Sequence, residues 1–414
     1  MRLRYVADVN PIVDGLTKRD AGRTISFLPL ETIWYDERFD PSRVIAFTGD
    51  VLSYNPVAEG DILLPKVSPT FAHGRVARAA GLAGGRALAT SEVFVIRAHD
   101  AGAARFLIYR LRSRDFRDAG VGSWTGVAGL KRVSADFVRD TRIDAHAWSR
   151  RELIVDFLDR ECSRVDRLAL KMSSLLVVAF EDLESTRERM LLSAGDLVRL
   201  KYGLTDLVDT AHATCPEIST GDHFVIRTTG VRHGVLDAAG CYRTDDANFA
   251  LWTSRREPRP GDVVFTREAP AGEAAVIPPH GSWCLGQRSV LLVLDRRRLN
   301  PDFVVLAMYG RAVKEEIALR GRSTTAAHVN VAEIGELRIP IPSLAEQAAL
   351  VENFLREQAR NARLRAITHA AITTLAEYRD ALITEAVTGQ LDVTAASDAQ
   401  MDERMHEAVE AASV

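Results

Sequence analysis

Two long segments of the chain carry apolar residues at intervals of three and four positions, the pattern of a helix that packs along one face. The first begins near Ser149 and ends before Gly195, and the second begins at Ser343 and ends before Gly389. Both serines precede a glutamate by three positions, the signature of a capped helix start, and both glycines suit the left-handed residue that closes a helix. The pattern predicts two helices of about 45 residues, roughly 65 Å each.

Neither helix is expected to be stable alone in water, because its apolar face would stay exposed. We therefore expect the two helices to pack against each other, and an antiparallel pair satisfies the connections with short links. The residues expected in this seam and in the docking of partner chains are Ile154, Phe157, Leu158, Val165, Leu168, Leu175, Phe354, Leu364, Leu375, Tyr378 and Leu382.

The remainder of the chain contains two stretches that repeat each other. EGDILLPKVSP at residues 59–69 returns as PGDVVFTREAP at residues 260–270, each with a Gly-Asp turn, three apolar residues and a following cation. This order is typical of a turn, a buried strand and an exposed cation. Further matched stretches are 1–5 with 198–202, 91–96 with 288–293, and 106–111 with 303–309. The chain is therefore predicted to be a tandem duplication.

These patterns predict an α+β fold, in which two similar α/β domains are separated by two long antiparallel helices and related by a pseudo-twofold axis. The expected limits are a first domain at 1–146, a helix at 147–194, a second domain at 195–342, a helix at 343–390 and an acidic, disordered tail at 391–414. Two similar domains held apart at a fixed separation suit a target with two sites, and duplex DNA is the commonest such target.

Composition and charge permit this interpretation. The 414 residues are 47% apolar, and no run approaches the ~20 uncharged apolar residues of a membrane span, so a soluble, cytoplasmic protein is expected. The formal charge is −3, but the last twenty residues alone carry −4, which leaves +1 on residues 1–394. Local arginine groups matter more for phosphate binding than net charge does. These groups are Arg110, Arg112, Arg114 and Arg117; Arg255, Arg256 and Arg259; and Arg320 and Arg322.

A search for catalytic motifs finds none. The chain has no phosphate-binding loop, no strand-bounded glycine fingerprint for a dinucleotide and no amino-methyltransferase signature. Its four cysteines and ten histidines show no metal-ligand spacing, so free thiols and no metal site are expected. We therefore predict a chain that is not itself an enzyme.

Particular helical residues resemble a known family. Residues 339–347, 375–383 and 386–389 are similar to the distal conserved helix of the DNA-specificity subunit of type I restriction–modification enzymes. Residues 157–166 are similar to the proximal helix of that family, with Cys162 where a threonine is frequent. The resemblance extends over nearly the whole chain.

The resemblance implies a sequence-specific DNA-binding role. Each target-recognition domain would read one half of an asymmetric bipartite site, while the helices set the unspecified gap and dock two methyltransferase subunits. The expected partners are double-stranded DNA, those modification subunits and restriction/translocase subunits, with no membrane. S-adenosylmethionine and ATP with magnesium would be bound by the partners, and this chain would be non-catalytic and hold no cofactor of its own.

The DNA contacts are expected in polar loops after the repeated strands. Candidates for phosphate contact are Lys66, Arg75, Lys131, Arg267, Arg320 and Arg322. Candidates for base edges are Ser123, Thr125, Ser323, Thr324 and Asn330, with Arg288 for guanine and Glu268 for cytosine. Ser68, His73 and His328 lie in the same loops and complete the predicted set. An ordinary solvated loop position is the alternative for each of them.

Two other functions stay open at the level of sequence. One is a coiled-coil scaffold whose duplicated domains bind protein or another ligand. The other is a self-sufficient nuclease or methyltransferase with unfamiliar motifs. Salt-dependent DNA binding would separate a DNA reader from a scaffold, and catalysis by the lone chain would favour the enzyme.

Overall fold

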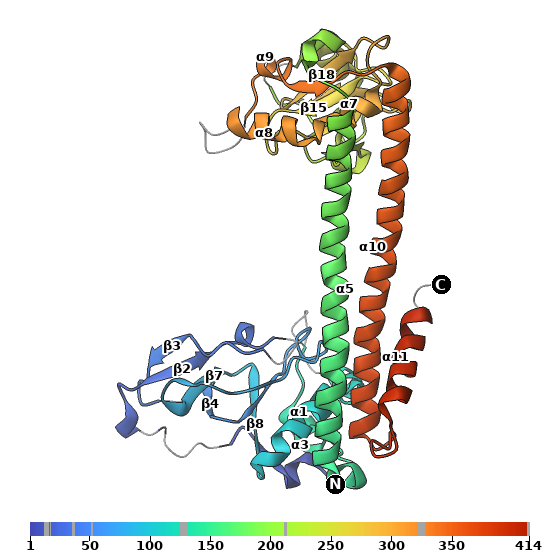
Figure 1. Cartoon of the computed structure of the whole chain (residues 1–414). Coiled ribbons are helices and arrows are strands. Elements are labelled where there is room, and N and C mark those ends of the chain that lie inside the picture. The colour runs from blue at the N-terminus through green and yellow to red at the C-terminus, as the bar shows by residue number, and fades with distance from the viewer. Residues whose placement is uncertain are drawn as a thin grey trace. The chain divides into compact units, whose positions relative to one another are not determined.

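The computed structural model of the chain describes residues 1–11, 16, 18–34, 38–50, 53–124, 131–210, 213–320 and 328–411 (Figure 1). It forms two compact units: unit 1 is residues 1–175 with 367–414, and unit 2 is residues 176–366. Both units combine sheets with helices, so the α+β class predicted from the sequence is confirmed. The unit boundaries fall inside the two long helices, because each helix contributes one part to each unit.

Unit 1 contains two four-stranded sheets, with strand orders β1-β8-β5-β6 and β3-β2-β7-β4. The strands are β1 (Ala7–Val9), β2 (Thr24–Leu28), β3 (Val44–Ala46), β4 (Tyr54–Ala58), β5 (Ile62–Pro65), β6 (Ala77–Arg78), β7 (Arg86–Thr90) and β8 (Val93–Ala98). In the first sheet every pairing is antiparallel, and Ile62 of β5 lies opposite Ile96 of β8. In the second sheet β2 and β7 are parallel. Strand β5 is buried throughout, as its unbroken apolar run predicts.

Unit 2 repeats this plan with sheets ordered β10-β18-β15-β16 and β14-β11-β17. The strands are β9 (Leu197–Arg199), β10 (Leu204–Asp209), β11 (His223–Ile226), β12 (Val231–Arg232), β13 (Val235–Leu236), β14 (Tyr242–Thr244), β15 (Val263–Thr266), β16 (Ala274–Val276), β17 (Trp283–Leu285), β18 (Ser289–Leu294) and β19 (Arg338–Pro340). Val263 of β15 lies opposite Leu292 of β18, and β11 and β17 are parallel. Two short antiparallel pairs, β12-β13 and β9-β19, complete the unit.

The repeated Gly-Asp turn has the same function in both units. Asp61 accepts a hydrogen bond from the amide of Ala58 at 2.7 Å, and Asp262 accepts one from the amide of Arg259 at 2.9 Å. The preceding glycine adopts φ +87° in unit 1 and +86° in unit 2, a conformation that L side chains rarely adopt. Each turn thus closes a tight loop before its buried strand. The duplication predicted from the sequence is therefore present in strand order, register and turn geometry.

Short helices cover the sheets. In unit 1 they are α1 (Ala104–Arg112), α2 (Arg114–Gly122), α3 (Ala135–Asp140) and α4 (Ala145–Ser149). In unit 2 they are α6 (Asp246–Trp252), α7 (Pro301–Met308), α8 (Arg311–Arg320) and α9 (Val331–Ile334). Phe106 of α1 and Phe303 of α7, which begin the apolar segments that repeat in the sequence, are fully buried. Each segment supplies a large part of the core of its own unit.

The two long helices are α5 (Arg151–Ser193) and α10 (Leu344–Val387). The capping box predicted for α10 is confirmed, because the amide of Ser343 donates to Glu346 at 2.9 Å and the amide of Glu346 donates to the Ser343 hydroxyl at 3.4 Å. The one predicted at Ser149 is wrong. Ser149 ends α4, and its hydroxyl donates to the carbonyl of His146 at 2.7 Å, so it does not cap α5. Both predicted C-terminal glycines, Gly195 and Gly389, have positive φ.

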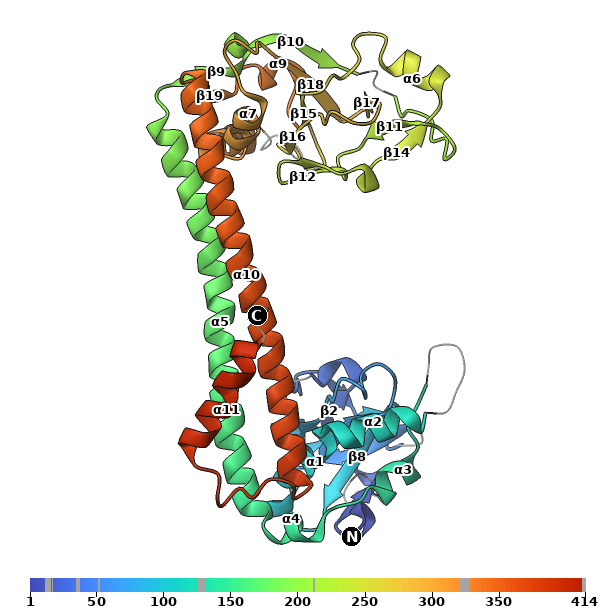
Figure 2. The same cartoon turned by 90° about the vertical axis from the view of Figure 1, so that its right-hand side faces the viewer.

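Within unit 1 the start of α5 packs beside the end of α10, so the two helices are antiparallel there (Figures 1 and 2). The buried residues at this contact are Ile154, Phe157, Leu158 and Leu382, and the partly buried Tyr378 packs against them. Val165 of α5 and Leu375 of α10 are also buried. Within unit 2 the end of α5 packs beside the start of α10, where Leu191 and Phe354 are buried. The antiparallel seam predicted from the sequence is thus present in each unit.

Three predicted seam residues differ from the rest. Leu168 is only partly buried. Leu175 and Leu364 are 53% and 48% exposed, so neither is buried in the seam, and partner docking, the other role predicted for them, stays a prediction. The apolar spacing of α5 is not restricted to one face in this region, since Val177, Val178 and Phe180 are also more than half exposed. A spacing rule alone could not identify which apolar residues face the neighbouring helix.

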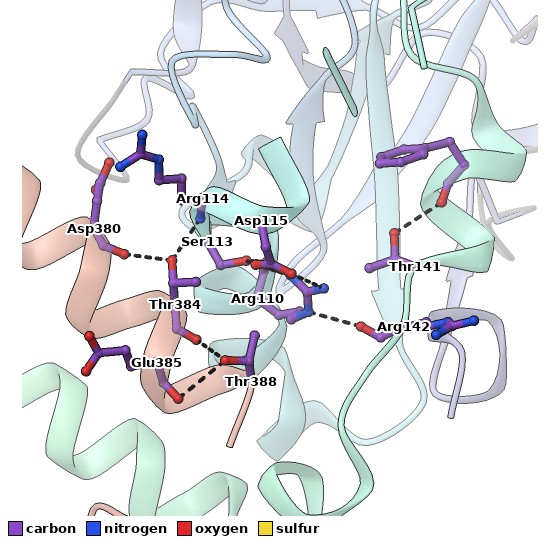
Figure 3. Close-up of polar contacts among 11 residues, drawn as sticks. Arg110, Ser113, Arg114, Asp115, Thr141, Arg142, Asp380, Thr384, Glu385 and Thr388 are labelled. Carbon is purple, nitrogen blue, oxygen red and sulfur yellow. Dashed lines mark hydrogen bonds and ion pairs between the residues drawn. The ribbon is translucent and has the colours of Figure 1, made fainter. Parts of the chain in front are cut away.

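Polar contacts attach the small helices of unit 1 to α10 (Figure 3). The first amide of α2, that of Arg114, donates to the Thr384 hydroxyl at 2.9 Å, and Arg117 forms an ion pair with Asp380 at 2.5 Å. Between α1 and α2, the nearly buried Arg110 donates to the carbonyl of Arg142 at 3.0 Å and pairs with Asp115 at 2.9 Å. The domain of unit 1 is therefore joined to its helix by charge-assisted hydrogen bonds as well as by the core.

The expectation that the acidic tail is disordered is wrong for residues 398–411. These residues form α11 (Asp398–Ala411), which packs beside the long helices in unit 1 (Figure 2). Met401 is 4% exposed in the unit 1 core, and Asp402 and Asp398 form ion pairs with Arg164 and Arg160 of α5. The acidic composition suggested disorder, whereas burial of Met401 stabilises the helix, and the arginines of α5 offset part of its negative charge.

Candidate nucleic-acid interface

Each unit has a polar edge where three chain segments meet, and the backbone builds it in the same way twice. In unit 1 the amide of Lys66 donates to the carbonyl of Glu92 at 3.0 Å, and the amide of Val133 donates to the carbonyl of Lys66 at 3.0 Å. In unit 2 the amide of Arg267 donates to the carbonyl of Arg288 at 2.9 Å, and the amide of Val329 donates to the carbonyl of Arg267 at 3.0 Å. Lys66 and Arg267 are therefore equivalent positions.

We call these regions the polar edges. In unit 1 the polar edge consists of Lys66–Ser68, Glu92 and residues 131–133, and in unit 2 it consists of residues 267–268, Arg288 and residues 328–329. Four predicted DNA-contacting residues, Thr125, Arg322, Ser323 and Thr324, lie outside the described residues. The remaining predicted residues can be placed.

Several predicted contacts of unit 1 come together at its polar edge. The amide of Ser68 donates to the carbonyl of Lys131 at 2.9 Å, which brings the neighbourhood of Lys66 and Lys131 together. The Lys66 ammonium lies 5.7 Å from the ring centroid of Phe94, and that of Lys131 lies 5.8 Å from the ring of Trp124. Both cations are thus positioned over aromatic faces.

The other residues predicted in unit 1 differ in exposure and in their contacts. His73 is exposed in the turn after Ser68, where its amide donates to the carbonyl of Pro69 at 3.1 Å. Arg75 donates to the carbonyl of Ile33 at 3.3 Å, and its Nε is buried without a hydrogen-bond partner, which is at odds with a phosphate contact. The Ser123 hydroxyl donates to the carbonyl of Gly120 at 2.8 Å and so belongs to the end of α2.

In unit 2, the Arg267 side chain is buried and pairs with an aspartate inside the unit. It is 7% exposed, and its guanidinium donates to both carboxylate oxygens of Asp209 at 3.2 and 3.3 Å and to the carbonyl of Val329 at 3.4 Å. A buried, hydrogen-bonded ion pair of this kind is expensive to open. This geometry is at odds with the phosphate contact predicted for Arg267, although its backbone equivalent Lys66 is half-buried beside an aromatic ring.

Two further predictions have local partners. Arg320 donates to Glu316 at 3.0 Å, one turn earlier on α8. Asn330 is the N-cap of α9 and forms a capping box with Glu333, and its amide group donates to that carboxylate at 2.9 Å. Its side chain is therefore committed to the start of α9, which is at odds with base reading.

An exposed charged cluster remains on the polar edge of unit 2. Glu268 accepts from Arg288 Nε at 3.0 Å and lies 3.3 Å from His328 Nδ1, while His328 Nε2 lies 3.3 Å from the Arg267 guanidinium. The side chains of Arg288, Glu268 and His328 are 48%, 36% and 36% exposed. This cluster brings together predicted residues from three segments that are far apart in the sequence.

Sequence reasoning missed the corresponding pair in unit 1, Glu92 with Arg132. The Arg132 guanidinium donates from Nε at 2.9 Å and from Nη2 at 3.0 Å to the two carboxylate oxygens of Glu92. The hydrogen bond from Arg132 lowers the pKa of Glu92 below its usual value, although partial burial opposes that shift. The two residues are forty positions apart, so no spacing rule could have paired them.

A cavity of about 480 Å³ lies beside the polar edge of unit 2 and is lined by polar side chains that include Thr214, Arg227, Tyr242, Gln287 and Arg288. The Thr214 hydroxyl donates to the Gln287 amide oxygen at 3.0 Å, and the Tyr242 hydroxyl donates to the carbonyl of Cys215 at 2.8 Å. Burial raises the pKa of Tyr242 to about 12, so this phenol stays neutral at physiological pH.

Cys162, Cys215 and Cys284 are buried free thiols, as predicted, whereas Cys241 is only partly buried. In the described part of the chain, no three His, Cys, Asp or Glu side chains are grouped so that they could hold a metal ion. Of the helices that can be described, none has the length and apolar character that a membrane crossing requires.

The fold defined by these units is that of type I restriction–modification specificity subunits. A chain from a structural study of complex assembly and conformational transition in a type I R-M system aligns with TM-score 0.66 and 16% identity, covering 94% of this chain and 97% of that one. The HsdS subunit from Thermoanaerobacter tengcongensis aligns with TM-score 0.55 and 18% identity, covering 94% and 96% of the two chains. At these identities the likeness establishes the fold.

In sequence, the chain is similar to two curated proteins of Escherichia coli. It is 30% identical over 170 residues to the type I restriction enzyme EcoAI specificity subunit, covering 40% of this chain and 28% of that protein. It is 31% identical over 139 residues to the EcoEI specificity subunit, covering 33% and 23%. The matches thus span about a quarter of the length of these relatives. No protein-family model matches the chain. The resemblance inferred from the sequence is confirmed in sequence and in fold.

Proposed function

We propose that this chain is the sequence-specific DNA-binding subunit of a type I restriction–modification complex. Unit 1 and unit 2 each read one half of an asymmetric bipartite site. The long helices α5 and α10 set the unspecified gap and dock two methyltransferase subunits. The chain itself is non-catalytic, and its partners supply S-adenosylmethionine, ATP and magnesium in the cytoplasm.

The observation that carries this proposal is the pair of polar edges. One backbone design is built twice, with equivalent hydrogen bonds at Lys66 and Arg267, yet the side chains on the two edges differ. Glu92 occupies the position in unit 1 that Arg288 occupies in unit 2. Since base edges are distinguished by donor and acceptor pattern, two edges with different donors and acceptors suit two different half-sites.

The long helices support the partner role. In the part of α5 that belongs to unit 2, three large apolar side chains are more than half exposed: Val177 at 58%, Val178 at 56% and Phe180 at 56%. Exposed apolar residues that gather on one helix are unusual for a chain that acts alone and are typical of a surface that another protein covers. We assign this surface to the methyltransferase subunits.

The test is to co-express the chain with the modification subunits of its host in a strain that lacks other methylation, and to sequence the methylome. The proposal expects a single asymmetric motif of two specified halves around an unspecified gap, and expects methylation to depend on both proteins. Binding of the assembled complex to DNA should weaken steeply as salt is raised, because phosphate contacts release counterions. Methyl transfer or cleavage by the lone chain would contradict it.

The gap can be tested separately. Inserting four residues at facing positions of α5 and α10 adds ~6 Å of helix, which is close to two base-pair steps of ~3.4 Å. The preferred gap should lengthen by one or two base pairs while the two specified halves keep their sequences. A methylated motif with an unchanged gap would reject the assignment of gap length to the helices.

A further inference from the structure

The two polar edges share a feature that the repeat in the sequence does not reveal. In each unit an arginine is held by a glutamate through its Nε atom: Arg132 by Glu92 at 2.9 Å in unit 1, and Arg288 by Glu268 at 3.0 Å in unit 2. The exposed fractions match, since the two arginine side chains are 43% and 48% exposed and the two glutamates 32% and 36%.

The two pairs are built from opposite positions of the repeat. Backbone equivalence places Glu92 where Arg288 lies, and Arg132 where His328 lies. In unit 1 the arginine therefore comes from the segment before α3 and the glutamate from the turn before β8. In unit 2 the arginine comes from the turn before β18 and the glutamate from the segment after β15. Each polar edge thus has an arginine–glutamate pair, but the two pairs occupy different positions of the repeat. The pairs were therefore not simply copied by the duplication, which favours a shared function.

A carboxylate on Nε gives an arginine a defined orientation. The guanidinium is planar, so fixing Nε fixes the direction in which the rest of the fork points. The arginine fork matches the O6 and N7 acceptors of guanine in the major groove, the commonest base-specific contact in protein–DNA complexes. An arginine fixed before DNA arrives also loses less side-chain freedom on binding.

We propose that Arg132 and Arg288 are the guanine-reading side chains of units 1 and 2. Glu92 and Glu268 are positioning residues that act through these arginines. The inference rests on the proposed function and deepens it, because it requires at least one G·C pair in each half of the recognised site. It also gives Glu268 a role different from the cytosine contact predicted from the sequence.

The experiment is methylome sequencing of the co-expressed complex with single variants. For Arg288→Ala we expect methylated sites with another base at one guanine of one half-site to rise roughly tenfold to a hundredfold. For Arg132→Ala we expect the same loss of discrimination in the other half-site. Arg288→Gln should shift the preference at its position from guanine towards adenine, since a glutamine amide pairs with adenine N6 and N7.

The chain supplies matched controls. Arg199 pairs through Nε with Glu336 at 3.1 Å, and these side chains are 49% and 39% exposed, nearly the values of Arg288 and Glu268. In unit 1, Arg139 is 41% exposed beside Asp136. Arg199→Ala and Arg139→Ala should leave the motif unchanged. Glu268→Gln should relax the same guanine as Arg288→Ala, but less, with an unchanged thermal midpoint.

The outcomes separate the two proposals. If the wild-type complex yields no bipartite motif, the proposed function fails. If it yields such a motif but one half has no G·C pair, or if Arg132→Ala and Arg288→Ala keep every guanine as strict as in the wild type, the assignment of the two arginines is overturned. Thermal unfolding of each variant complex shows whether a loss of methylation is due to misfolding. Arg288→Gln then tests the guanine contact directly, because a shift of preference to adenine supports it and an unchanged preference overturns it.

Discussion

Arg379 of α10 donates a hydrogen bond from Nη1 to the carboxylate of Asp166 on α5 at 2.8 Å, joining the two long helices within unit 1. The arginine side chain is 9% exposed, while the aspartate is 52% exposed. The stem of Arg379 is therefore buried, as Leu375 and Leu382 of the same helix are, and its Nη1 reaches the more exposed Asp166. The seam is therefore held by apolar burial together with a charged clasp.

We expect Arg379→Met to keep the apolar packing and lose the clasp. The cost should be roughly 1.5–3 kcal/mol of unfolding free energy, the usual range for a hydrogen bond to a charged group. Urea denaturation of the full chain measures it. Arg360→Met is the control, because Arg360 is 84% exposed on α10, and its effect should stay within ~0.5 kcal/mol. Equal losses of unfolding free energy in the two variants would show that the Arg379–Asp166 contact does not stabilise the seam.

Leu382 and Leu175 should respond differently to truncation, because they differ in burial. Leu382 is 1% exposed and Leu175 is 53% exposed, although both fit the same apolar spacing. Leu382→Ala should lower the unfolding free energy by ~2–5 kcal/mol. Leu175→Ala should change it by no more than ~0.5 kcal/mol. Co-purification with the proposed methyltransferase partner provides the second measurement, since only an exposed residue can lose a partner contact without loss of stability.

The C-terminal helix α11 should contribute stability through its methionine and little through its charges. Met401 is 4% exposed, so Met401→Ala should cost ~2–5 kcal/mol. Asp402 is 59% exposed in its pair with Arg164, so Asp402→Asn should cost less than ~1 kcal/mol. Thermal unfolding of the full chain compares them. A Met401→Ala variant with unchanged unfolding would show that α11 does not bury Met401 in the core of unit 1.

Two buried thiols should make stability depend on alkaline pH. Burial raises the pKa of Cys162 and of Cys284 to about 12. In the unfolded chain a thiol loses its proton near pH 8.5–9. Their stabilising contribution is therefore complete below about pH 9 and declines as pH rises towards 12, because only the unfolded state releases the proton in that window.

Cys162→Ala and Cys284→Ala should each flatten the decline of unfolding free energy between pH 9 and 12 relative to the wild type. In the native protein both thiols should also react slowly with a thiol reagent at pH 8, and the partly buried Cys241 should react faster. The same alkaline slope in wild type and variants would assign the decline to tyrosines instead.

The repeated elements were predictable because their signals are local. The turn at Asp61 and Asp262 and the capping box at Ser343 and Glu346 each lie within a few residues, so sequence spacing carries the geometry. Ser149 has the same spacing to a glutamate, yet α4 uses it instead. Ser149 ends α4 and so does not cap α5, and the sequence alone does not show which of two adjacent helices will include such a residue.

For the polar edges, the sequence predicted a region and not the contacts within it. Arg288 and Glu268 were predicted as separate candidates for base contact, and the structure pairs their side chains at 3.0 Å. Arg267, the residue beside Glu268, is directed into the interior by Asp209. In the described part of unit 1 the equivalent pair, Glu92 and Arg132, was not foreseen, because each residue looked like an ordinary surface charge.

The sequence by itself determined the duplication, the two long helices and their antiparallel pairing, because turns, caps and apolar periodicity depend on residues only a few positions apart. Only the tertiary structure decided that Leu175 is exposed, that Met401 is buried and that Arg132 is held by Glu92. These outcomes depend on contacts between distant segments, where burial and electrostatic pairing override the preference of any short stretch of chain.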